Sequence, residues 1–202
     1  MTKPVIAIDV DDVLADNAAG FVAFSNERWG TNLKSEDYDE DWMTMWGISL
    51  EEAVKRRDVL FASDTQRQYG HNQDALHVLR NLAKRYDLRI VTSRHIATRD
   101  DTRAWIHERY PGVFSDETIH FAGLWDNPDH TSLIKTKAGM VASLGADYLI
   151  DDQLKHCIGV ADSGRTALLF GDYRWNQTDG KLPDNIIRVK DWASVERYFD
   201  ES

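Results

Sequence analysis

Short apolar runs alternate along the chain with segments whose apolar residues recur at helical spacing. The runs predict buried strands of a parallel sheet, because they lack the polar alternation of a strand with one solvated face. They span residues 5–8, 88–91, 119–123, 147–152, 167–171 and 185–189. Helical spacing predicts helices over residues 18–29, 50–61, 75–86, 99–110, 140–144 and 192–199. The alternation indicates an α/β fold with a three-layer, Rossmann-like parallel sheet.

Residues 31–70 differ from the rest because they contain no strand-like run. An acidic stretch with interleaved aromatics, residues 37–42, is followed by Ser49 and Glu52, which match a capping box at the start of the 50–61 helix. We interpret residues 17–71 as a small helical cap, called here the helical insertion, lying over the end of the first strand. Residues 1–16 and 72–202 then form the core.

Two tryptophans of the helical insertion, Trp42 and Trp46, have two interpretations. Their i, i+4 spacing places them on one face of a helix, where they would pack the interior of the insertion. They would alternatively form a wall against a planar ring of a substrate, because aromatic side chains stack on nucleobases.

Composition limits the class of partner. The 202 residues carry a formal net charge of −10, which argues against binding a nucleic-acid polymer through bulk electrostatics but does not exclude a small phosphorylated substrate. The single cysteine permits neither a disulfide within the chain nor a Cys-x-x-Cys zinc pair. No apolar stretch approaches the ~20 residues of a membrane span, and no signal peptide is evident, so a cytoplasmic location is expected.

Candidate chemistry begins where the first apolar run ends, at Asp9, Asp11 and Asp12. Carboxylates at the tip of a buried strand repel one another unless a cation neutralises them, and ligands bind at strand tips in open α/β sheets. A solvated turn rich in Asp is the alternative. The run at residues 147–152 repeats the theme with Asp151 and Asp152. If the two strands are neighbours, their acids converge into a magnesium site of hard oxygen ligands.

Two further segments suit phosphate binding. Thr92 and Ser93 end the second apolar run, where hydroxyl groups and backbone N–H groups bind phosphate or simply form a turn. Lys137 stands at the start of the 140–144 helix, where a cation opposes the helix dipole unless an anion is present. A solvated lysine is the alternative.

In this order the motifs resemble those of the haloacid dehalogenase superfamily of phosphotransferases. That family has an Asp-x-Asp strand end, a strand ending in Thr or Ser, a lysine, and a strand ending in paired acids. The corresponding residues here are Asp9-Val10-Asp11-Asp12-Val13-Leu14, Thr92, Lys137 and Asp151-Asp152. Lys135 is an alternative for the loosely spaced third motif.

Within the superfamily, the segment Val13-Leu14-Ala15-Asp16-Asn17 and the helical insertion before the second motif resemble the 5'(3')-deoxyribonucleotidase group. One position departs from the pattern, since many relatives have Gly where this chain has Asp12. The extra carboxylate would either face solvent or point inward and alter metal affinity.

The resemblance implies residue roles. Asp9 would attack phosphorus and form an aspartyl-phosphate, and Asp11 would act as general acid and then as general base. Mg²⁺ would be held by Asp9, the backbone carbonyl of Asp11, and Asp151. The phosphate oxygens would contact Thr92, Ser93 and Lys137, while Asp152 would orient a metal-bound water or the lysine.

The expected function is Mg²⁺-dependent hydrolysis of a nucleoside monophosphate through this aspartyl-phosphate intermediate. A phosphatase of sugar phosphates or another small metabolite would share the same core. A phosphate-binding module without turnover is a third possibility, against which the intact acids Asp9, Asp11 and Asp151 argue.

Overall fold

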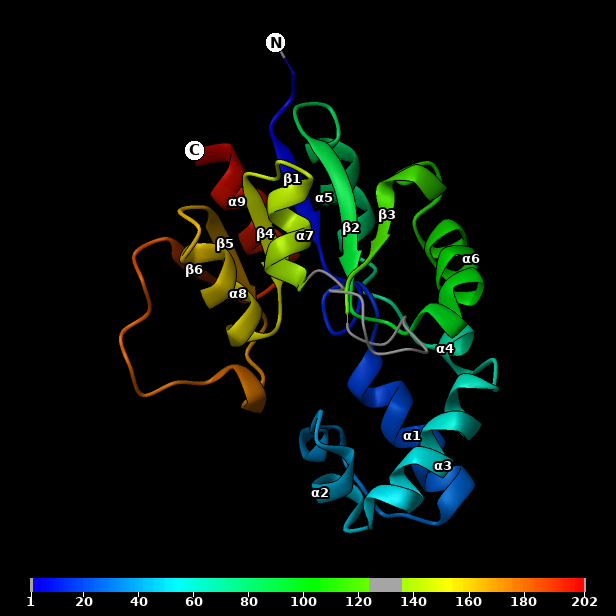
Figure 1. Cartoon of the computed structure of the whole chain (residues 1–202). Helices are drawn as coiled ribbons and strands as arrows, with labels where there is room; N and C mark the ends of the chain where they lie inside the picture. The colour runs from blue at the N-terminus through cyan, green and yellow to red at the C-terminus, as the bar shows by residue number, and fades with distance from the viewer. Residues whose placement is uncertain (1, 124–135, 202) are drawn as a thin grey trace.

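A six-stranded parallel sheet forms the centre of the molecule (Figure 1). The computed structural model describes residues 2–123 and 136–201. The strand order is β3-β2-β1-β4-β5-β6. The strands are β1 (Val5–Ile8), β2 (Asp87–Thr92), β3 (Ile119–Phe121), β4 (Tyr148–Asp151), β5 (Thr166–Phe170) and β6 (Ile186–Val189). All six predicted runs are strands, which confirms the α/β prediction.

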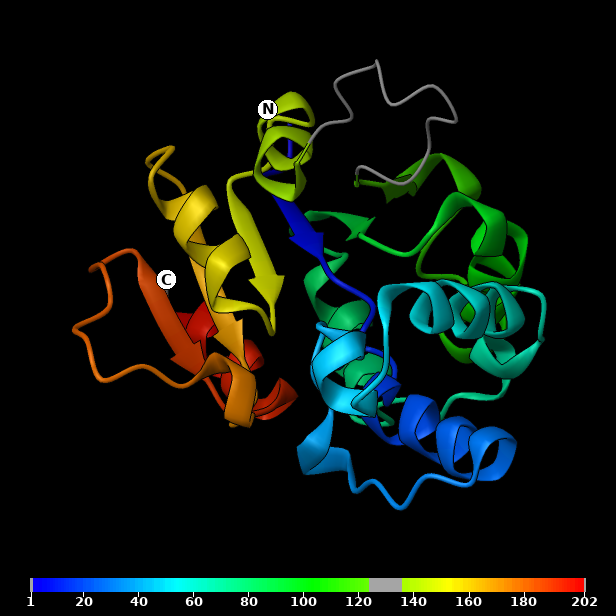
Figure 2. The ribbon, with the colours of Figure 1, turned by 60° about the horizontal axis from the view of Figure 1, so that its bottom comes forward.

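Helices cover both faces of the sheet, as a three-layer fold requires (Figures 1 and 2). One face packs against α5 (Ala75–Leu82), α6 (Arg99–Arg109) and α9 (Trp192–Glu201), and the other against α7 (Lys137–Ser143) and α8 (Leu154–Ala161). Strand β1 shows the two-residue alternation behind this arrangement, because Ile6 and Ile8 join the first hydrophobic cluster and Ala7 the second. Among the helices that the structure describes, none is both long and apolar enough to cross a bilayer.

Helix α8 was not predicted from the sequence. It contains Gly159, which weakens a helical pattern by about 1 kcal/mol relative to Ala. The structure gives a packing reason for this glycine, since a Cβ atom there would lie 3.3 Å from the Cβ of Ala138 in α7. The close packing of α7 against α8 therefore favours glycine at position 159, and a glycine inside a helix weakens the pattern from which the helix would be predicted.

The order in which successive strands are added to the sheet reverses between β1 and β4. Strands β2 and β3 follow on one side of β1, and β4, β5 and β6 lie on the other. Ile8 is paired with Ile150, and the Asp9 N–H donates a 2.9 Å hydrogen bond to the Ile150 carbonyl. Open α/β sheets bind ligands at the carboxyl ends of the strands at such a switch point. Strands β1 and β4 are therefore neighbours, which is the condition under which their terminal acids come together.

The helical insertion lies beyond the carboxyl ends of the strands (Figures 1 and 2). It contains α1 (Asn17–Trp29), α2 (Trp42–Trp46), α3 (Leu50–Phe61) and α4 (Thr65–Gln68), and no strand occurs in residues 31–70. Its interior is a hydrophobic cluster separate from the two clusters that flank the sheet. Helix α1 is followed by Gly30, which caps it with a left-handed φ of 64°.

The predicted capping box at α3 is half formed. The Ser49 hydroxyl accepts a hydrogen bond from the Glu52 N–H, but the Glu52 carboxylate pairs with Arg56.

Candidate active site

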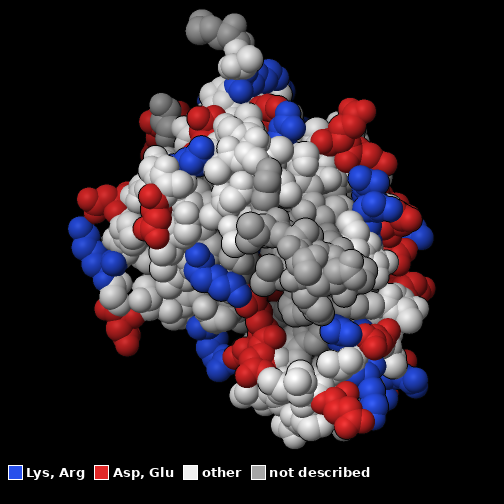
Figure 3. Space-filling model, in the orientation of Figure 1, with Lys and Arg blue, Asp and Glu red and all other residues white. Residues whose placement is uncertain are grey.

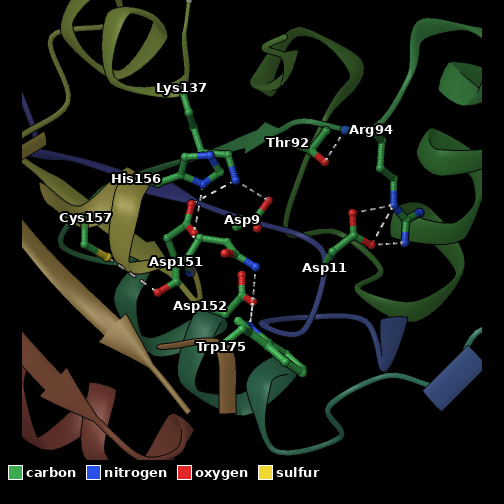
Figure 4. Close-up of polar contacts among 11 residues, drawn as sticks. Asp9, Asp11, Thr92, Arg94, Lys137, Asp151, Asp152, His156, Cys157 and Trp175 are labelled. Carbon is green, nitrogen blue, oxygen red and sulfur yellow. Dashed lines mark hydrogen bonds and ion pairs between the residues drawn. The ribbon is translucent and has the colours of Figure 1, made fainter. Parts of the chain in front are cut away.

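Three carboxylates meet at the carboxyl ends of β1 and β4 (Figure 4). Asp9 follows β1, Asp151 ends β4 and Asp152 comes next; their exposed fractions are 4%, 0% and 2%. One oxygen of each lies within 4.8 Å of the others. These three residues are called the carboxylate cluster. Its burial excludes the solvated turn that the Asp-rich sequence alone allowed.

Lys137 places a positive charge in direct contact with this cluster. It is the first residue of α7, and its Nζ lies 2.9 Å from Asp9 Oδ1 and 2.8 Å from Asp151 Oδ2 (Figure 4). The side chain is only 2% exposed, so it is not a solvated lysine. The alternative motif residue, Lys135, lies outside the described residues.

Burial and mutual repulsion dominate the electrostatics of the carboxylate cluster. Burial raises the pKa of Asp9 to about 8, with Asp151 adding to the rise and Lys137 opposing it. Burial and the charge of Asp151 likewise raise the pKa of Asp152. The pKa of Asp151 is lowered despite its burial, because Lys137 and His156 both stabilise its charged form. One lysine therefore does not neutralise all three acids.

The residues present fit a divalent cation. Asp9 Oδ1 is buried and accepts no hydrogen bond from the part of the chain that the structure describes; its contact with Lys137 is an ion pair. Three carboxylates supply the hard oxygen ligands that Mg²⁺ prefers, and an added cation would relieve their repulsion. From the sequence, Asp152 is expected to orient a metal-bound water or the lysine rather than to bind the metal. The structure instead brings its carboxylate into the cluster itself.

The side chain of Asp11 points away from the carboxylate cluster and toward Arg94 (Figure 4). Arg94 Nε lies 3.0 Å and 3.2 Å from the two Asp11 oxygens, and Arg94 Nη2 lies 2.8 Å from Asp11 Oδ1. Arg94 is buried, with its guanidinium beside the rings of Tyr69 and Trp105. Both carboxylate oxygens of Asp11 are therefore held by one rigid, two-pronged donor.

The two hydroxyl residues after β2 have different environments. Thr92 is fully buried at the end of β2, and its Oγ1 accepts a 3.2 Å hydrogen bond from the Arg94 N–H. Ser93 is exposed. Strand β2 pairs with β1, so Thr92 ends the strand beside the one that Asp9 follows, and Ser93 comes directly after it. Their binding of phosphate stays a prediction.

The structure gives Asp12 a structural explanation. Its φ of 55° is left-handed, a conformation that Gly adopts freely and that Asp tolerates better than most residues. The buried carboxylate accepts hydrogen bonds from the Ala18 N–H at 2.9 Å and the Asn17 side chain at 3.3 Å. Asp12 therefore points inward and holds the start of α1 rather than facing solvent.

We predict a pH-dependent stability contribution from Asp12. Burial raises its pKa from 3.8 to about 7, with the Ala18 N–H opposing the rise. Between these values the folded protein retains a proton that the unfolded chain has lost, so stability falls as pH rises through this window. Asp12→Asn removes this titration while keeping an acceptor for Ala18. Thermal unfolding from pH 4 to 7.5 is expected to show the variant gaining on the wild type as pH rises; parallel curves would contradict the prediction.

The structure places Trp46 in the interior of the helical insertion. It is 9% exposed, its ring stacks on Phe21, and its Nε1 donates to Ser25 Oγ at 3.3 Å. Trp46 is therefore packed as the first interpretation proposed, and it does not form a wall open to substrate. Trp42 is half-buried and contacts Phe21 and Phe61. A substrate contact by Trp42 stays a prediction.

The helical insertion touches the core on two sides of the carboxylate cluster. On the β2 side, the ring of Phe61 stacks on His95 at 4.9 Å. On the β5 side, Glu40 pairs with Lys155, and oppositely charged side chains meet at this junction in Figure 3. A cavity of about 320 Å³ opens there, lined by Tyr38, Asp39, Glu40, Gln153, Leu154, Lys155 and Trp175. A larger cavity of about 880 Å³ lies at the amino ends of the strands, away from the carboxylate cluster.

Three side chains at the site were not assigned from the sequence. Arg94 holds Asp11, His156 Nδ1 lies 3.2 Å from Asp151 Oδ1, and Trp175 Nε1 donates a 2.6 Å hydrogen bond to Asp152 Oδ2. The sequence contains a weak indication that Arg94 belongs to the site, because it stands two residues after Thr92. The sequence contains no such indication for Trp175, since it is 23 residues from Asp152.

Known proteins resemble the chain in sequence and in fold. The family model of the 5' nucleotidase, deoxy (pyrimidine), cytosolic type C protein (NT5C) matches residues 3–126. A candidate 5'(3')-deoxyribonucleotidase of Staphylococcus epidermidis is 27% identical over 206 residues, covering 99% of this chain and 98% of the relative. One of Staphylococcus aureus is 29% identical over 210 residues, covering 98% and 97%.

Among solved structures, a haloacid dehalogenase-like hydrolase from Streptococcus pneumoniae superposes with a TM-score of 0.70 at 16% identity. The superposition covers 98% of both chains. At this identity the likeness establishes a shared fold, which agrees with the predicted α/β architecture.

Proposed function

Because the chain belongs to the 5' nucleotidase, deoxy (pyrimidine), cytosolic type C family and is a phosphatase of phosphomonoesters, we propose that it hydrolyses nucleoside monophosphates, deoxyribonucleotides among them. The observation that carries the proposal is the buried Asp9, next to Lys137 and within the carboxylate cluster at the switch point of the sheet. A carboxylate in that position can approach a phosphate group that enters from the strand ends.

In the proposed first half-reaction, an Asp9 carboxylate oxygen forms a bond to phosphorus and the bond from phosphorus to the ester oxygen breaks. This gives an aspartyl-phosphate and an alkoxide leaving group, which takes a proton from Asp11. The contact with Lys137 keeps Asp9 oriented and favours its charged form.

In the second half-reaction, a water molecule attacks phosphorus and transfers its proton to Asp11, which restores Asp9 and releases phosphate. Asp11 is held by Arg94 in the structure. Transfer of a proton to or from the substrate therefore requires the Asp11 side chain to turn from Arg94 toward the reacting oxygen.

Mg²⁺ is the proposed cofactor, which the side chains of Asp9, Asp151 and Asp152 and the backbone carbonyl of Asp11 would hold. When bound, the cation offsets the negative charge of the phosphate and of the carboxylate cluster. Lys137, Thr92 and Ser93 would supply the remaining donors to the phosphate oxygens.

The helical insertion of residues 17–71 is proposed to act as a cap on the leaving group. Its residues Tyr38, Asp39 and Glu40 line the cavity beside Trp175, so it contributes side chains that the core of residues 1–16 and 72–202 lacks. A nucleobase would find aromatic surface at this junction.

A screen of phosphate esters tests the proposal. With Mg²⁺, we expect the highest kcat/KM among ribo- and deoxyribonucleoside monophosphates and lower values for sugar phosphates, with phosphate release lost in EDTA. Sugar phosphates hydrolysed as efficiently as nucleotides would favour the metabolite phosphatase instead. No release from any ester would contradict catalysis at this site.

A further inference from the structure

The loop after β5 brings an aromatic donor onto the carboxylate cluster from a distant part of the chain. Trp175 Nε1 donates a 2.6 Å hydrogen bond to Asp152 Oδ2 (Figure 4). The Gln153 side-chain amide donates to the same oxygen at 3.2 Å. Among the described residues, no donor bonds to the other oxygen, Asp152 Oδ1. The two donors therefore fix one oxygen of Asp152 and leave the second for a cation.

The indole of Trp175 is itself fixed on several sides. One face stacks on Tyr173 with centroids 4.6 Å apart and planes 4° from parallel, and Tyr38 of the helical insertion meets it edge-on at 5.5 Å. The Tyr173 hydroxyl donates to the Asp12 carbonyl at 2.8 Å. The stack thus connects the Asp152 hydrogen bond to the loop that follows Asp9.

Backbone conformation and buried hydrogen bonds also hold the loop that carries Trp175 in place. Gly171 has a left-handed φ of 79°, and a Cβ there would lie 2.2 Å from the Tyr173 ring. Asn176 is fully buried, and its side chain donates to the Phe170 carbonyl at 2.9 Å. Arg188 of β6 donates to Asn176 Oδ1 at 3.0 Å. Residues on both sides of Trp175 are therefore anchored to the sheet.

An indole N–H is a donor without a positive charge. A lysine or arginine at this position would hold Asp152 equally but would repel a divalent cation. We propose that Trp175 is a positioning residue of the metal site, which orients Asp152 toward the cation without competing for it. This inference rests on the proposed Mg²⁺ site.

Mn²⁺ binding, followed by the electron paramagnetic resonance signal of free Mn²⁺, tests the inference without reference to turnover. Trp175→Phe keeps a ring to stack on Tyr173 and removes the N–H. We expect its Kd for Mn²⁺ to rise about 10-fold, as for other partners that orient metal ligands. An unchanged Kd in a folded variant would overturn the inference. Absence of Mn²⁺ binding by the wild type would instead overturn the proposed metal site.

Trp192→Phe is the matched control, because it also removes one buried indole N–H, bonded to the Val13 carbonyl at 3.1 Å. It is expected to lower the unfolding temperature and leave the Mn²⁺ affinity unchanged. In an Asp152→Asn background, Trp175→Phe should weaken Mn²⁺ binding no further. An equal additional loss in that background would show that Trp175 does not act through Asp152.

A measurement on the intact chain covers the case in which Trp175→Phe fails to fold. The short hydrogen bond to a carboxylate should shift one of the seven tryptophan indole N–H signals downfield in a ¹H–¹⁵N spectrum. That signal is expected to move when Mg²⁺ is added and to lose its downfield shift in Asp152→Asn. A spectrum in which no indole signal responds to either change would overturn the inference.

Discussion

Replacing Asp9 with Asn is expected to reduce phosphate release by at least about four orders of magnitude, because an amide oxygen is a poor nucleophile toward phosphorus. The variant keeps the size and the backbone position of the side chain, so the sheet pairing through the Asp9 N–H and the Ile150 carbonyl is preserved. Initial rates with the best ester from the substrate screen, measured at saturating Mg²⁺, give the comparison.

The same substitution should not destabilise the fold. Burial raises the pKa of Asp9 to about 8, so its charge is unfavourable in the metal-free protein. A neutral Asn removes repulsion with Asp151, and the unfolding temperature in EDTA is expected to equal or exceed that of the wild type. Asp179→Asn, at an exposed loop position, makes the same chemical change and should retain full activity. Turnover within tenfold of the wild type would rule out Asp9 as the nucleophile.

The sequence predicts the sheet and the position of the acids because both depend on local patterns. A buried strand of a parallel sheet is an unbroken apolar run, and a run that ends in carboxylates places them at one edge. Asp9 and Asp151 were identified in this way. Lys137 was identified because a lysine in the first turn of a helix calls for a nearby anion.

Contacts between distant segments carry no such pattern. Arg94 and Asp11 are 83 residues apart, and either side chain could face solvent in the sequence alone. The position of Asp12 depends on a backbone angle, and its two interpretations differed only in the direction of the side chain. For Trp46, helical spacing defines one face of α2 but does not say what that face contacts.

The contacts that the sequence did not predict have a common physical effect on the site. Motif residues supply the charges, whereas Arg94, Trp175 and His156 supply the hydrogen bonds that orient Asp11, Asp152 and Asp151, respectively. Asp11 is held by a cation, Asp152 by a neutral donor, and Asp151 by a histidine and Lys137. The acids of the first and fourth motifs therefore differ in their environments, which supports the different roles proposed for Asp9 and Asp11.

Replacing Lys137 with Met is expected to have the largest effect on stability. The variant leaves Asp9 and Asp151 buried without the cation that lies within 3 Å of both. Removing one partner of a buried ion pair destabilises a protein by about 3–5 kcal/mol, and loss of a phosphate donor should lower kcat by ~10²-fold or more. Denaturant unfolding in EDTA measures the first effect.

Magnesium provides the decisive comparison for this variant. Without Lys137 the carboxylate cluster is more negative, so Mg²⁺ should bind more tightly and raise the unfolding temperature by more than it does in the wild type. Lys181→Met, which breaks an exposed pair with Asp184, should change neither stability nor the response to Mg²⁺. If Lys137→Met is as stable as the wild type in EDTA, the cluster is neutralised by protonation of its acids rather than by the lysine. An equal response of both proteins to Mg²⁺ would separate Lys137 from the metal site.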